Sequence, residues 1–446
     1  MEHAAGRDER TYLCIDLKTF YASVECVDRG LDPFTTNLVV ADPTRGNTTI
    51  CLAITPAMKA LGIRNRCRIF EIPPEVSYIK AMPRMRHYME VSARIYGIYL
   101  RYVSPDDIHP YSIDECFIDA TPYLRLYDLS ARAFAQKLMD EVRRDEGICA
   151  TAGIGPNLFL AKVALDITAK HVPDNIGVLD EEAFRQQIWP HRPITDIWGI
   201  GPGIAARLAK YHVHDLMGVA ALNEDILYRE FGVNAEYLID HAFGREPTTI
   251  AEIQAYRPAA SSYVNGQVLP GTYTYDEAHT VLKEMVDASA LELVERGQVT
   301  NHISLSVGYA ARAADADAGG VFVGEHGKRR LGPRRYGYAG GSHKLSGFTN
   351  SYRKLMTAFD ELWEERVSRD APIKRLSVGL GNLMPEEFST VDLFTDLEAD
   401  EREHDLQQAV LAVKGKFGKN ALLRGMSLTE KATARERNEQ VGGHHA

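Results

Sequence analysis

Hydrophobic and polar residues follow one another along the first half of the chain in patterns that predict interleaved strands and helices. Thr11 to Ile15 is a short β-prone run that ends at Asp16, and residues 17–27 continue as a helix. Further strands are expected at 38–41, 48–54 and 148–154, two strands turning at Ser112 to Glu115 within 108–120, and helices at 57–61, 85–103, 131–144 and 158–170. This order predicts a mixed α+β core with Asp16 and Asp114 at strand ends.

The second half changes character at Ile194, where short helices are punctuated by the Gly-Ile-Gly-Pro-Gly run at Gly199–Gly203. The pattern predicts a mostly helical domain to about Gly244 and a linker over 245–258. A compact α/β unit is expected to follow, with strands at 261–268, 303–309, 343–348 and 375–380 and helices at 275–295 and 351–367. With 446 residues, the chain is expected to form an α+β protein of three or four domains.

The composition argues against a membrane-spanning or secreted protein. Hydrophobic residues make up 45% of the chain, yet no window reaches the roughly 18 uninterrupted apolar residues of a membrane helix. The segment Met1 to Arg10 is polar where a secretory signal would be apolar. The six cysteines show no two-residue spacing of a zinc or redox pair, so we expect reduced thiols. A cytoplasmic protein with no membrane association is predicted.

The net charge of −10 does not by itself exclude a nucleic-acid partner. Nine acidic residues and one basic residue lie between Leu383 and Asp405, and the rest of the chain is nearly balanced. An acidic segment can lie far from a basic surface that neutralises phosphates, so the sign of the total charge decides little.

The densest chemical signal is Tyr111-Ser112-Ile113-Asp114-Glu115, with adjacent carboxylates in a turn between apolar strands. Taken alone, two such acids could form a solvated turn. Together with Asp16 at a second strand end they offer three hard oxygen ligands, which suit Mg²⁺. Two such ions can stabilise the attacking and leaving oxygens of a phosphoryl transfer.

The segments Ile15–Glu25 and Ser112–Glu115 resemble the two signature motifs of the Y-family DNA polymerases, closest to the UmuC-like bacterial branch, and the resemblance extends over nearly the whole chain. It implies an error-prone, template-directed DNA polymerase that bypasses damaged bases in DNA repair and SOS-type damage tolerance. The implied right-hand architecture has a palm (1–19 and 86–178), small fingers (20–85), a helical thumb with a helix-hairpin-helix (179–245), a C-terminal α/β little finger (257–382) and a tail (383–446).

Carried over residue by residue, the resemblance places Asp16 and Asp114 on both of two Mg²⁺ ions, Glu115 on the catalytic ion and the backbone carbonyl of Leu17 on the nucleotide-bound ion. Tyr21 matches the steric gate that excludes ribonucleotides, although an aromatic residue at helical spacing can also be a core residue. Phe20 fits the core better, and the family places it close to the nucleotide.

The triphosphate contacts depart from the family pattern. A Tyr and an Arg three residues apart are expected in the fingers, whereas this sequence reads Pro56-Ala57-Met58-Lys59. Lys59 offers a point charge without the bidentate fork of arginine, and Pro56 donates no hydrogen bond. Lys170 matches a palm lysine that reaches the phosphates; the alternative is an exposed lysine at a helix end.

Two further segments are candidates for DNA contacts. Gly199, Gly201 and Gly203 resemble a helix-hairpin-helix, whose glycines let backbone N–H groups approach a phosphate, or they form a simple turn between helices. The run Lys328, Arg329, Arg330, Arg334 and Arg335 would contact the template backbone, or it is solvated surface.

Thr390 to Phe394 resembles the peptide that binds the sliding clamp, with Leu393 and Phe394 filling an apolar pocket, or it is a chance match in a loop. The expected partners are primer-template DNA, deoxynucleoside triphosphates and the sliding clamp, and a monomer is expected. Two rival hypotheses remain: a catalytically weak, clamp-tethered DNA-binding scaffold, which the Pro56 and Lys59 departure favours, and a nucleotidyl cyclase, which would leave the hairpin and the basic run unexplained.

Overall fold

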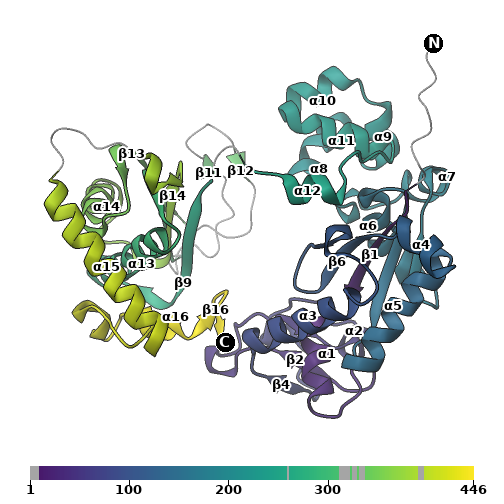
Figure 1. Cartoon of the computed structure of the whole chain (residues 1–446), viewed down its shortest axis with the longest axis horizontal. Helices are drawn as coiled ribbons and strands as arrows, with labels where there is room; N and C mark the ends of the chain where they lie inside the picture. Colours follow the sequence, from purple (N-terminus) through teal and green to yellow (C-terminus); the bar gives the residue numbers. More distant parts are fainter. Residues whose placement is uncertain are drawn as a thin grey trace. The chain divides into compact units, whose positions relative to one another are not determined.

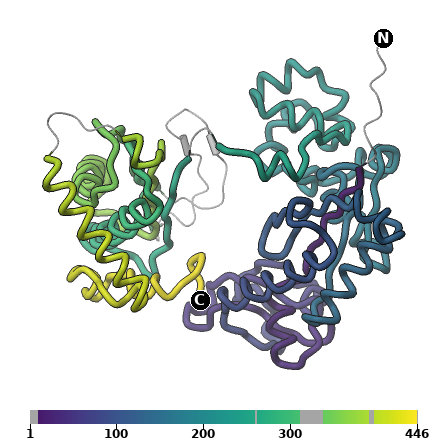
Figure 2. Tube along the Cα trace, viewed as in Figure 1, coloured from purple at the N-terminus to yellow at the C-terminus, as the bar shows by residue number. Residues whose placement is uncertain are grey.

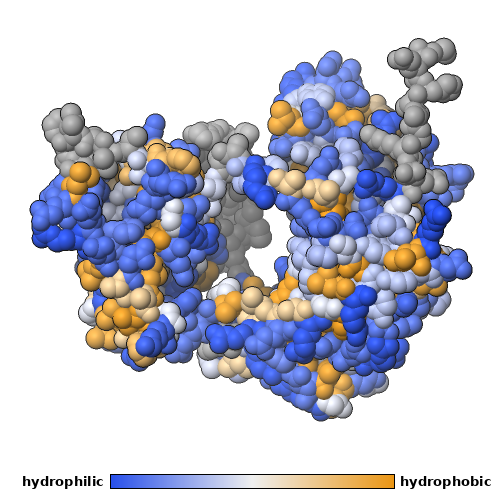
Figure 3. Space-filling model, in the orientation of Figure 1, coloured by the Kyte–Doolittle hydropathy of each residue, from blue (hydrophilic) through white to orange (hydrophobic). Residues whose placement is uncertain are grey.

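The computed structural model describes residues 10–258, 261–310, 322–323, 329–330, 337–389 and 396–445. The chain divides into two compact units, one up to Tyr256 and one from Arg257 onward (Figure 1). Helices and strands alternate in both, which confirms the expected α+β multidomain class. None of the helices among these residues is long and apolar enough to cross a membrane. The visible face of each unit is mostly hydrophilic with scattered apolar side chains (Figure 3).

The first unit is built around a five-stranded sheet with the order β5-β6-β1-β7-β8. Its strands are β1 (Tyr12–Leu17), β5 (Ile108–Pro110), β6 (Glu115–Asp119), β7 (Ala150–Gly155) and β8 (Ile176–Val178). The central β1 pairs antiparallel with β6 and β7, while β7 and β8 are parallel. The trace shows the purple β1 running among the blue segments that follow much later in the sequence (Figure 2).

Helices cover both faces of this sheet. They are α3 (Met85–Tyr99), α4 (Thr121–Tyr127), α5 (Ala131–Glu146), α6 (Leu158–Asp166) and α7 (Glu181–Ala183). Successive strand residues point to opposite faces, and the β1 side chains Leu13, Ile15 and Leu17 join the core formed with α3 and α5. Tyr12 and Cys14 pack on the other face against α6. Asp16 follows in the same alternation and therefore points to the α6 side.

Two glycines of β7 allow α6 to lie directly on the strand. A Cβ atom at Gly153 would lie 2.0 Å from the carbonyl oxygen of Ala161, and one at Gly155 would lie 2.6 Å from the amide nitrogen of Ala161. Any side chain at either position would therefore push the helix off the sheet. This contact fixes where the side chains of α6 reach the sheet edge.

A smaller lobe of the first unit surrounds a three-stranded sheet of order β3-β2-β4. It contains α1 (Phe20–Val27), β2 (Leu38–Val40), β3 (Ala53–Ile54), α2 (Pro56–Ala60) and β4 (Ile79–Ala81). The strand expected over 48–54 is thus wrong for its first five residues. There the chain makes only an isolated bridge between Ile50 and Arg68, because no strand lies beside it to continue a ladder.

The helical segment contains α8 (Pro202–Leu208), α9 (Leu216–Ala221), α10 (Glu224–Phe231), α11 (Ala235–Ala242) and α12 (Ile250–Ala255). Its apolar residues, including Leu208, Leu216 and Leu227, form a core together with one side of α6. The element before the glycine run is a single 3₁₀ turn, Ile194–Asp196, so the first helix expected of a helix-hairpin-helix is very short.

The second unit is an antiparallel sheet of order β13-β10-β14-β9 packed on two helices. Its elements are β9 (Tyr263–Tyr273), α13 (Tyr275–Glu295), β10 (Gln298–Tyr309), β11 (Phe322–Val323), β12 (Arg329–Arg330), β13 (Tyr338–Thr349), α14 (Tyr352–Arg366), β14 (Ile373–Gly381) and β15 (Met384–Pro385). The fully buried Trp363 lies in its core. The strands and helices expected from the sequence are present with somewhat longer strands.

The C-terminal segment is more ordered than the sequence suggested. It contains α15 (Leu397–Phe417), α16 (Ala434–Asn438), β16 (Gln440–Val441) and β17 (His444–His445). Gln407 of α15 is buried and donates to the Asn350 carbonyl, and Ser351 Oγ donates to Glu403 at 2.6 Å. The acidic first turn and basic last turn of α15 suit the helix dipole. What the sequence presented as a tail is a helix docked on the second unit.

Candidate active site

The register of β1 and β6 brings the predicted carboxylates together. Asp16 lies directly opposite Glu115 in the antiparallel pair, and cross-strand partners share a face of the sheet. Asp114 immediately precedes β6, and its carbonyl oxygen accepts a hydrogen bond from the Leu17 amide at 2.9 Å. All three carboxylates are partly exposed. Residues far apart in the sequence thus form one acidic edge that solvent and ions can reach.

Burial and, after it, repulsion between carboxylates both act on Asp16 at this edge. Desolvation by burial, followed by the charges of Asp114 and Glu115, raises the pKa of Asp16 to about 8. Ser112 Oγ donates to the Asp114 carboxylate at 2.7 Å, which orients that group. A carboxylate whose pKa is raised by two neighbouring anions is stabilised by any cation that binds among them.

Lys162 of α6 is the cation already present at this edge. Its side chain is 8% exposed and forms ion pairs with Glu115 and, at 3.0 Å, with Asp166. Burial opposes the charge, but Asp166 and Glu115 outweigh this effect and raise the pKa of Lys162. Burial also raises the pKa of Glu115, although Lys162 counteracts it. Lys162 is not among the predicted site residues, although a lysine within the apolar run of α6 is a signal in the sequence.

The acidic edge does not form a closed metal cage. Among the residues that the structure describes, no three His, Cys, Asp or Glu side chains converge into a metal-binding group. Glu115 faces Lys162 instead. The donors themselves are hard carboxylate oxygens, the kind that Mg²⁺ uses when water and phosphate oxygens complete its coordination. The residues therefore fit an open metal site, whose remaining ligands would come from water or a bound molecule.

Tyr21 and Phe20 occupy different environments at the start of α1. Phe20 is buried in the core, whereas Tyr21 is half-buried and stacks on Tyr88 with ring centroids 4.6 Å apart. Burial and the nearby Asp114 charge raise the pKa of Tyr21. Thr19 has a left-handed φ of 46°, which turns the chain sharply from β1 into α1. Tyr21 therefore lies beside the acidic edge with one ring face packed.

A buried network holds the ring under Tyr21 in place. Tyr88 donates its hydroxyl to the fully buried Glu25 at 2.7 Å, and Arg84 donates to the same carboxylate oxygen at 2.8 Å. Arg29 pairs with Glu25 as well. Because Tyr88 is fixed by these contacts, the position of Tyr21 is fixed too. Tyr88, Arg84 and Glu25 are positioning residues that the sequence analysis did not single out.

Three lysines surround the approach to Asp16. Desolvation lowers the pKa of Lys59; the charge of Asp16 opposes this shift, and those of Lys170 and Lys18 add to it. Lys170 is exposed in the 3₁₀ turn Thr168–His171, and Lys18 Nζ donates to Asn175 Oδ1 at 2.5 Å. The two predicted lysines, Lys59 and Lys170, thus interact electrostatically with each other. Lys18, which directly follows Asp16 and Leu17, is a third lysine whose charge acts on Lys59.

The remaining predicted contacts lie elsewhere or outside the described residues. Gly199 has a φ of +85° and Gly201 caps α8, with open space on the Cβ side of Gly199, Gly201 and Gly203. Arg329 and Arg330 form β12, without a description of their side chains. Lys328, Arg334, Arg335, Leu393 and Phe394 lie outside the described residues. Their DNA and clamp contacts stay predictions.

Comparison with known proteins gives consistent matches. Residues 15–166 match the impB/mucB/samB family, and residues 260–393 match the C-terminal domain of the same family, so more than half of the chain is covered. A Bacillus subtilis protein named for UV-damage repair, UvrX, is 29% identical over 98% of this chain and 97% of its own length. DNA polymerase IV 2 of the same organism is 29% identical over 98% of this chain and 99% of its own length.

DNA polymerase IV 2 of Halalkalibacterium halodurans is 28% identical over 98% of this chain and its whole length. Among solved structures, a Y-family DNA polymerase chimera superposes with a TM-score of 0.60 at 20% identity, over 84% of this chain and 99% of that one. The shared fold covers both units of the chain.

Proposed function

The chain belongs to the impB/mucB/samB family, and we propose on this basis that it is a template-directed DNA polymerase of the Y-family type that copies damaged templates. It adds deoxynucleotides to a primer 3′ end. The observation that carries the proposal is the pairing of Asp16 with Glu115 beside Asp114, which sets three carboxylates at one sheet edge. The relatives named DNA polymerase IV span nearly the whole chain and support the same function.

Divalent cations, which we propose to be two Mg²⁺ ions, would be held by Asp16, Asp114, Glu115 and the Leu17 carbonyl. When bound, they supply the positive charge that an in-line phosphoryl displacement needs. Asp16 and Asp114 bind and orient these ions, and the raised pKa of Asp16 supports a site that awaits a cation. Lys162 holds Glu115 at the edge through their ion pair, so that carboxylate is positioned before substrate arrives.

The nucleotide is proposed to lie between the acidic edge and α1. Lys59 and Lys170 contact its triphosphate, and Lys18 adds a third cation where an arginine fork is missing. Tyr21 places its ring against the sugar and excludes a 2′-hydroxyl, with Phe20 packed behind it in the core. The stacking of Tyr21 on Tyr88 supports this role, because a gate must not move aside when the larger sugar arrives.

DNA contacts are proposed for the hairpin glycines Gly199, Gly201 and Gly203 and for the basic run from Lys328 to Arg335. A clamp contact through Leu393 and Phe394, a monomeric state and a cytoplasmic location, where the DNA substrate lies, complete the proposal. The alternative of a DNA-binding scaffold retains one supporting observation, which is the replacement of the expected Tyr and Arg by Pro56 and Lys59.

Primer extension with Mg²⁺ tests the proposal. We expect the protein to extend a primer on undamaged and damaged templates, and Asp114→Ala to reduce extension by at least a hundredfold, because the acidic edge loses a cation ligand. Asp140→Ala is the matched control, since it removes the same charge from an exposed position on α5. A wild-type protein that binds primer-template but extends nothing would support the scaffold instead.

A further inference from the structure

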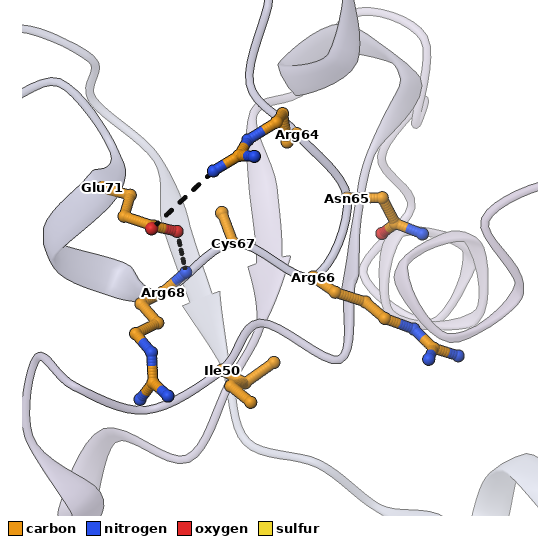
Figure 4. A pocket seen from close by; sticks show the side chains of 7 residues that line it. All are labelled: Ile50, Arg64, Asn65, Arg66, Cys67, Arg68 and Glu71. Carbon is orange, nitrogen blue, oxygen red and sulfur yellow. Dashed lines mark hydrogen bonds and ion pairs between the residues drawn. The ribbon is translucent and has the colours of Figure 1, made fainter. Parts of the chain in front are cut away.

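The small lobe of the first unit carries an arginine-rich pocket apart from the acidic edge. It has a volume of about 330 Å³ and is lined by Arg64, Asn65, Arg66, Arg68, Glu71 and Ile50 (Figure 4). Three of these residues are cationic and one is anionic. A pocket with this charge balance favours an anionic ligand.

The backbone under these arginines is held firmly. The Cys51 amide donates to the Cys67 carbonyl at 2.8 Å, and Ile50 bridges to Arg68. The Arg68 amide donates to the Glu71 carboxylate at 2.8 Å, while the Arg68 guanidinium donates to the Thr48 carbonyl at 2.5 Å. The segment from Arg64 to Arg68 is therefore a preformed loop, so a ligand can bind without a loss of conformational entropy in this loop.

The guanidinium groups of Arg64 and Arg66 on this loop make few contacts with the rest of the described chain. Arg64 is 83% exposed and reaches Glu71 at 3.8 Å, a surface pair that contributes little to stability. Arg66, which has a left-handed φ of 59°, makes no hydrogen bond or ion pair with any residue in the described part of the chain. Figure 4 shows Arg66 pointing away from the Arg64–Glu71 pair. Two guanidinium groups thus remain available to a ligand.

Exposed apolar side chains accompany these cations, one in the pocket and one close by in the sequence. Ile50 is 47% exposed in the pocket, and Phe70, which follows the loop by two residues, is 56% exposed. Cationic groups combined with exposed apolar and aromatic side chains are typical of surfaces that bind single-stranded nucleic acid, where bases stack and phosphates are neutralised.

The arginine loop lies in the same small lobe as α1 and α2, which carry Tyr21 and Lys59. The charge of Arg66 acts on the Tyr21 hydroxyl, on which Asp114 acts as well. The charges that act on Lys59, by contrast, are those of Asp16, Lys170 and Lys18. The arginine loop and Tyr21 thus belong to one lobe, and Arg66 is near enough for its charge to act on Tyr21.

We propose that Arg64 and Arg66 bind the phosphodiester backbone of the unpaired template strand ahead of the site of synthesis. The inference rests on the proposed polymerase function, because that function requires a single strand to enter beside the nucleotide. Binding through phosphates is independent of base identity, so a damaged base in this segment would not weaken it.

Fluorescence anisotropy with primer-templates that carry template overhangs of one or ten nucleotides tests this proposal without catalysis. Wild type is expected to bind the long overhang more tightly, and Arg64→Ala/Arg66→Ala to lose that gain while binding the short overhang normally. Each lost phosphate contact lowers the slope of log K against log salt by about 0.7, so the double variant should lose about 1.4. The affinity of the double variant for the long overhang, relative to wild type, should therefore fall about 25-fold further when the salt concentration is lowered from 1 M to 0.1 M.

Two controls keep the result interpretable. Arg143→Ala removes an exposed arginine of α5 and should leave the overhang gain intact. Arg64→Lys/Arg66→Lys retains both charges and should restore most of the salt slope, which a misfolded loop would not do. An overhang gain that survives in the alanine variant overturns the inference, and so does an equal loss for both overhangs. A wild type with an arginine-dependent overhang gain but no primer extension would refute the proposed function alone.

Discussion

Replacing Lys162 with methionine tests how the acidic edge is held together in the absence of metal. Lys162 is 8% exposed and Glu115 is 13% exposed, and a second carboxylate, Asp166, lies 3.0 Å from the same ammonium group. Two unit charges at 3.0 Å attract by about 5 kcal/mol at an effective dielectric constant of about 20, before desolvation is subtracted. Removing one partner of a buried pair typically costs roughly 3–5 kcal/mol, because the other charge is left unpaired.

We therefore expect Lys162→Met to lower the free energy of unfolding by about 3 kcal/mol in EDTA, as measured by denaturant titration. Glu115→Gln should remove much of this sensitivity, so the loss from Lys162→Met should be smaller in the Glu115→Gln background. Lys210→Met, which breaks the exposed pair with Glu230, serves as the control and should cost less than about 1 kcal/mol.

Adding Mg²⁺ should raise the unfolding temperature of Lys162→Met more than that of wild type, since the cation replaces the lost positive charge at Glu115. A loss below about 1 kcal/mol in EDTA would refute the reasoning, because the buried pair would then not hold the edge together. The same conclusion would follow from an identical loss with and without Glu115→Gln, since the two residues would then act independently.

Three further predictions concern the same site. Tyr21→Ala should increase ribonucleotide incorporation, measured by alkaline cleavage of the product, while Tyr21→Phe should preserve exclusion because the ring remains; equal discrimination in all three proteins would contradict the gate. Because the native pKa of Asp16 is raised to about 8 from an ordinary 3.8, the metal-free native state binds the extra proton between these values. Its stability should therefore fall as pH rises from about 4 to 8, and thermal unfolding of Asp16→Asn should show a flatter profile. Lys18→Ala and Lys59→Ala should each raise the KM for the nucleotide in steady-state extension with little change in DNA affinity. Asn175→Gly removes the hydrogen-bond partner of Lys18 and tolerates the left-handed φ of 59° at this position, so it should have a smaller effect.

The sequence predicted the elements that carry the acidic edge because their signals are local. Strand alternation before Asp16 and the turn at Ser112–Glu115 both follow from side-chain periodicity, and the structure has strands at these places. The pairing of Asp16 with Glu115 is a long-range register, which no local pattern encodes. The family resemblance placed the three carboxylates at one metal site, but the register itself comes from the structure.

Other features could not be read from the sequence for specific physical reasons. Lys162 lies in an apolar helical run, where a buried lysine is distinguished from an exposed one only by the strand on which the helix packs. The loop from Arg64 to Arg68 has no periodicity, and its form depends on contacts with residues distant in sequence, such as the bridge to Ile50 and the hydrogen bonds to Cys51 and Thr48. The helix α15 was hidden by its acidic composition, because its docking combines packing against α13 with polar contacts to the residues at the start of α14.

The backbone contact between α6 and β7 bears on how such an enzyme accommodates irregular templates. With no side chain between helix and strand at Gly153 and Gly155, the backbone of α6 rests directly on β7 and has little freedom to shift. Accommodation of irregular templates is then expected to come from segments other than this helix–strand contact. Base selection and bond formation can then depend on different segments of the chain. Substitutions that relax base selection should therefore leave the intrinsic rate of bond formation unchanged.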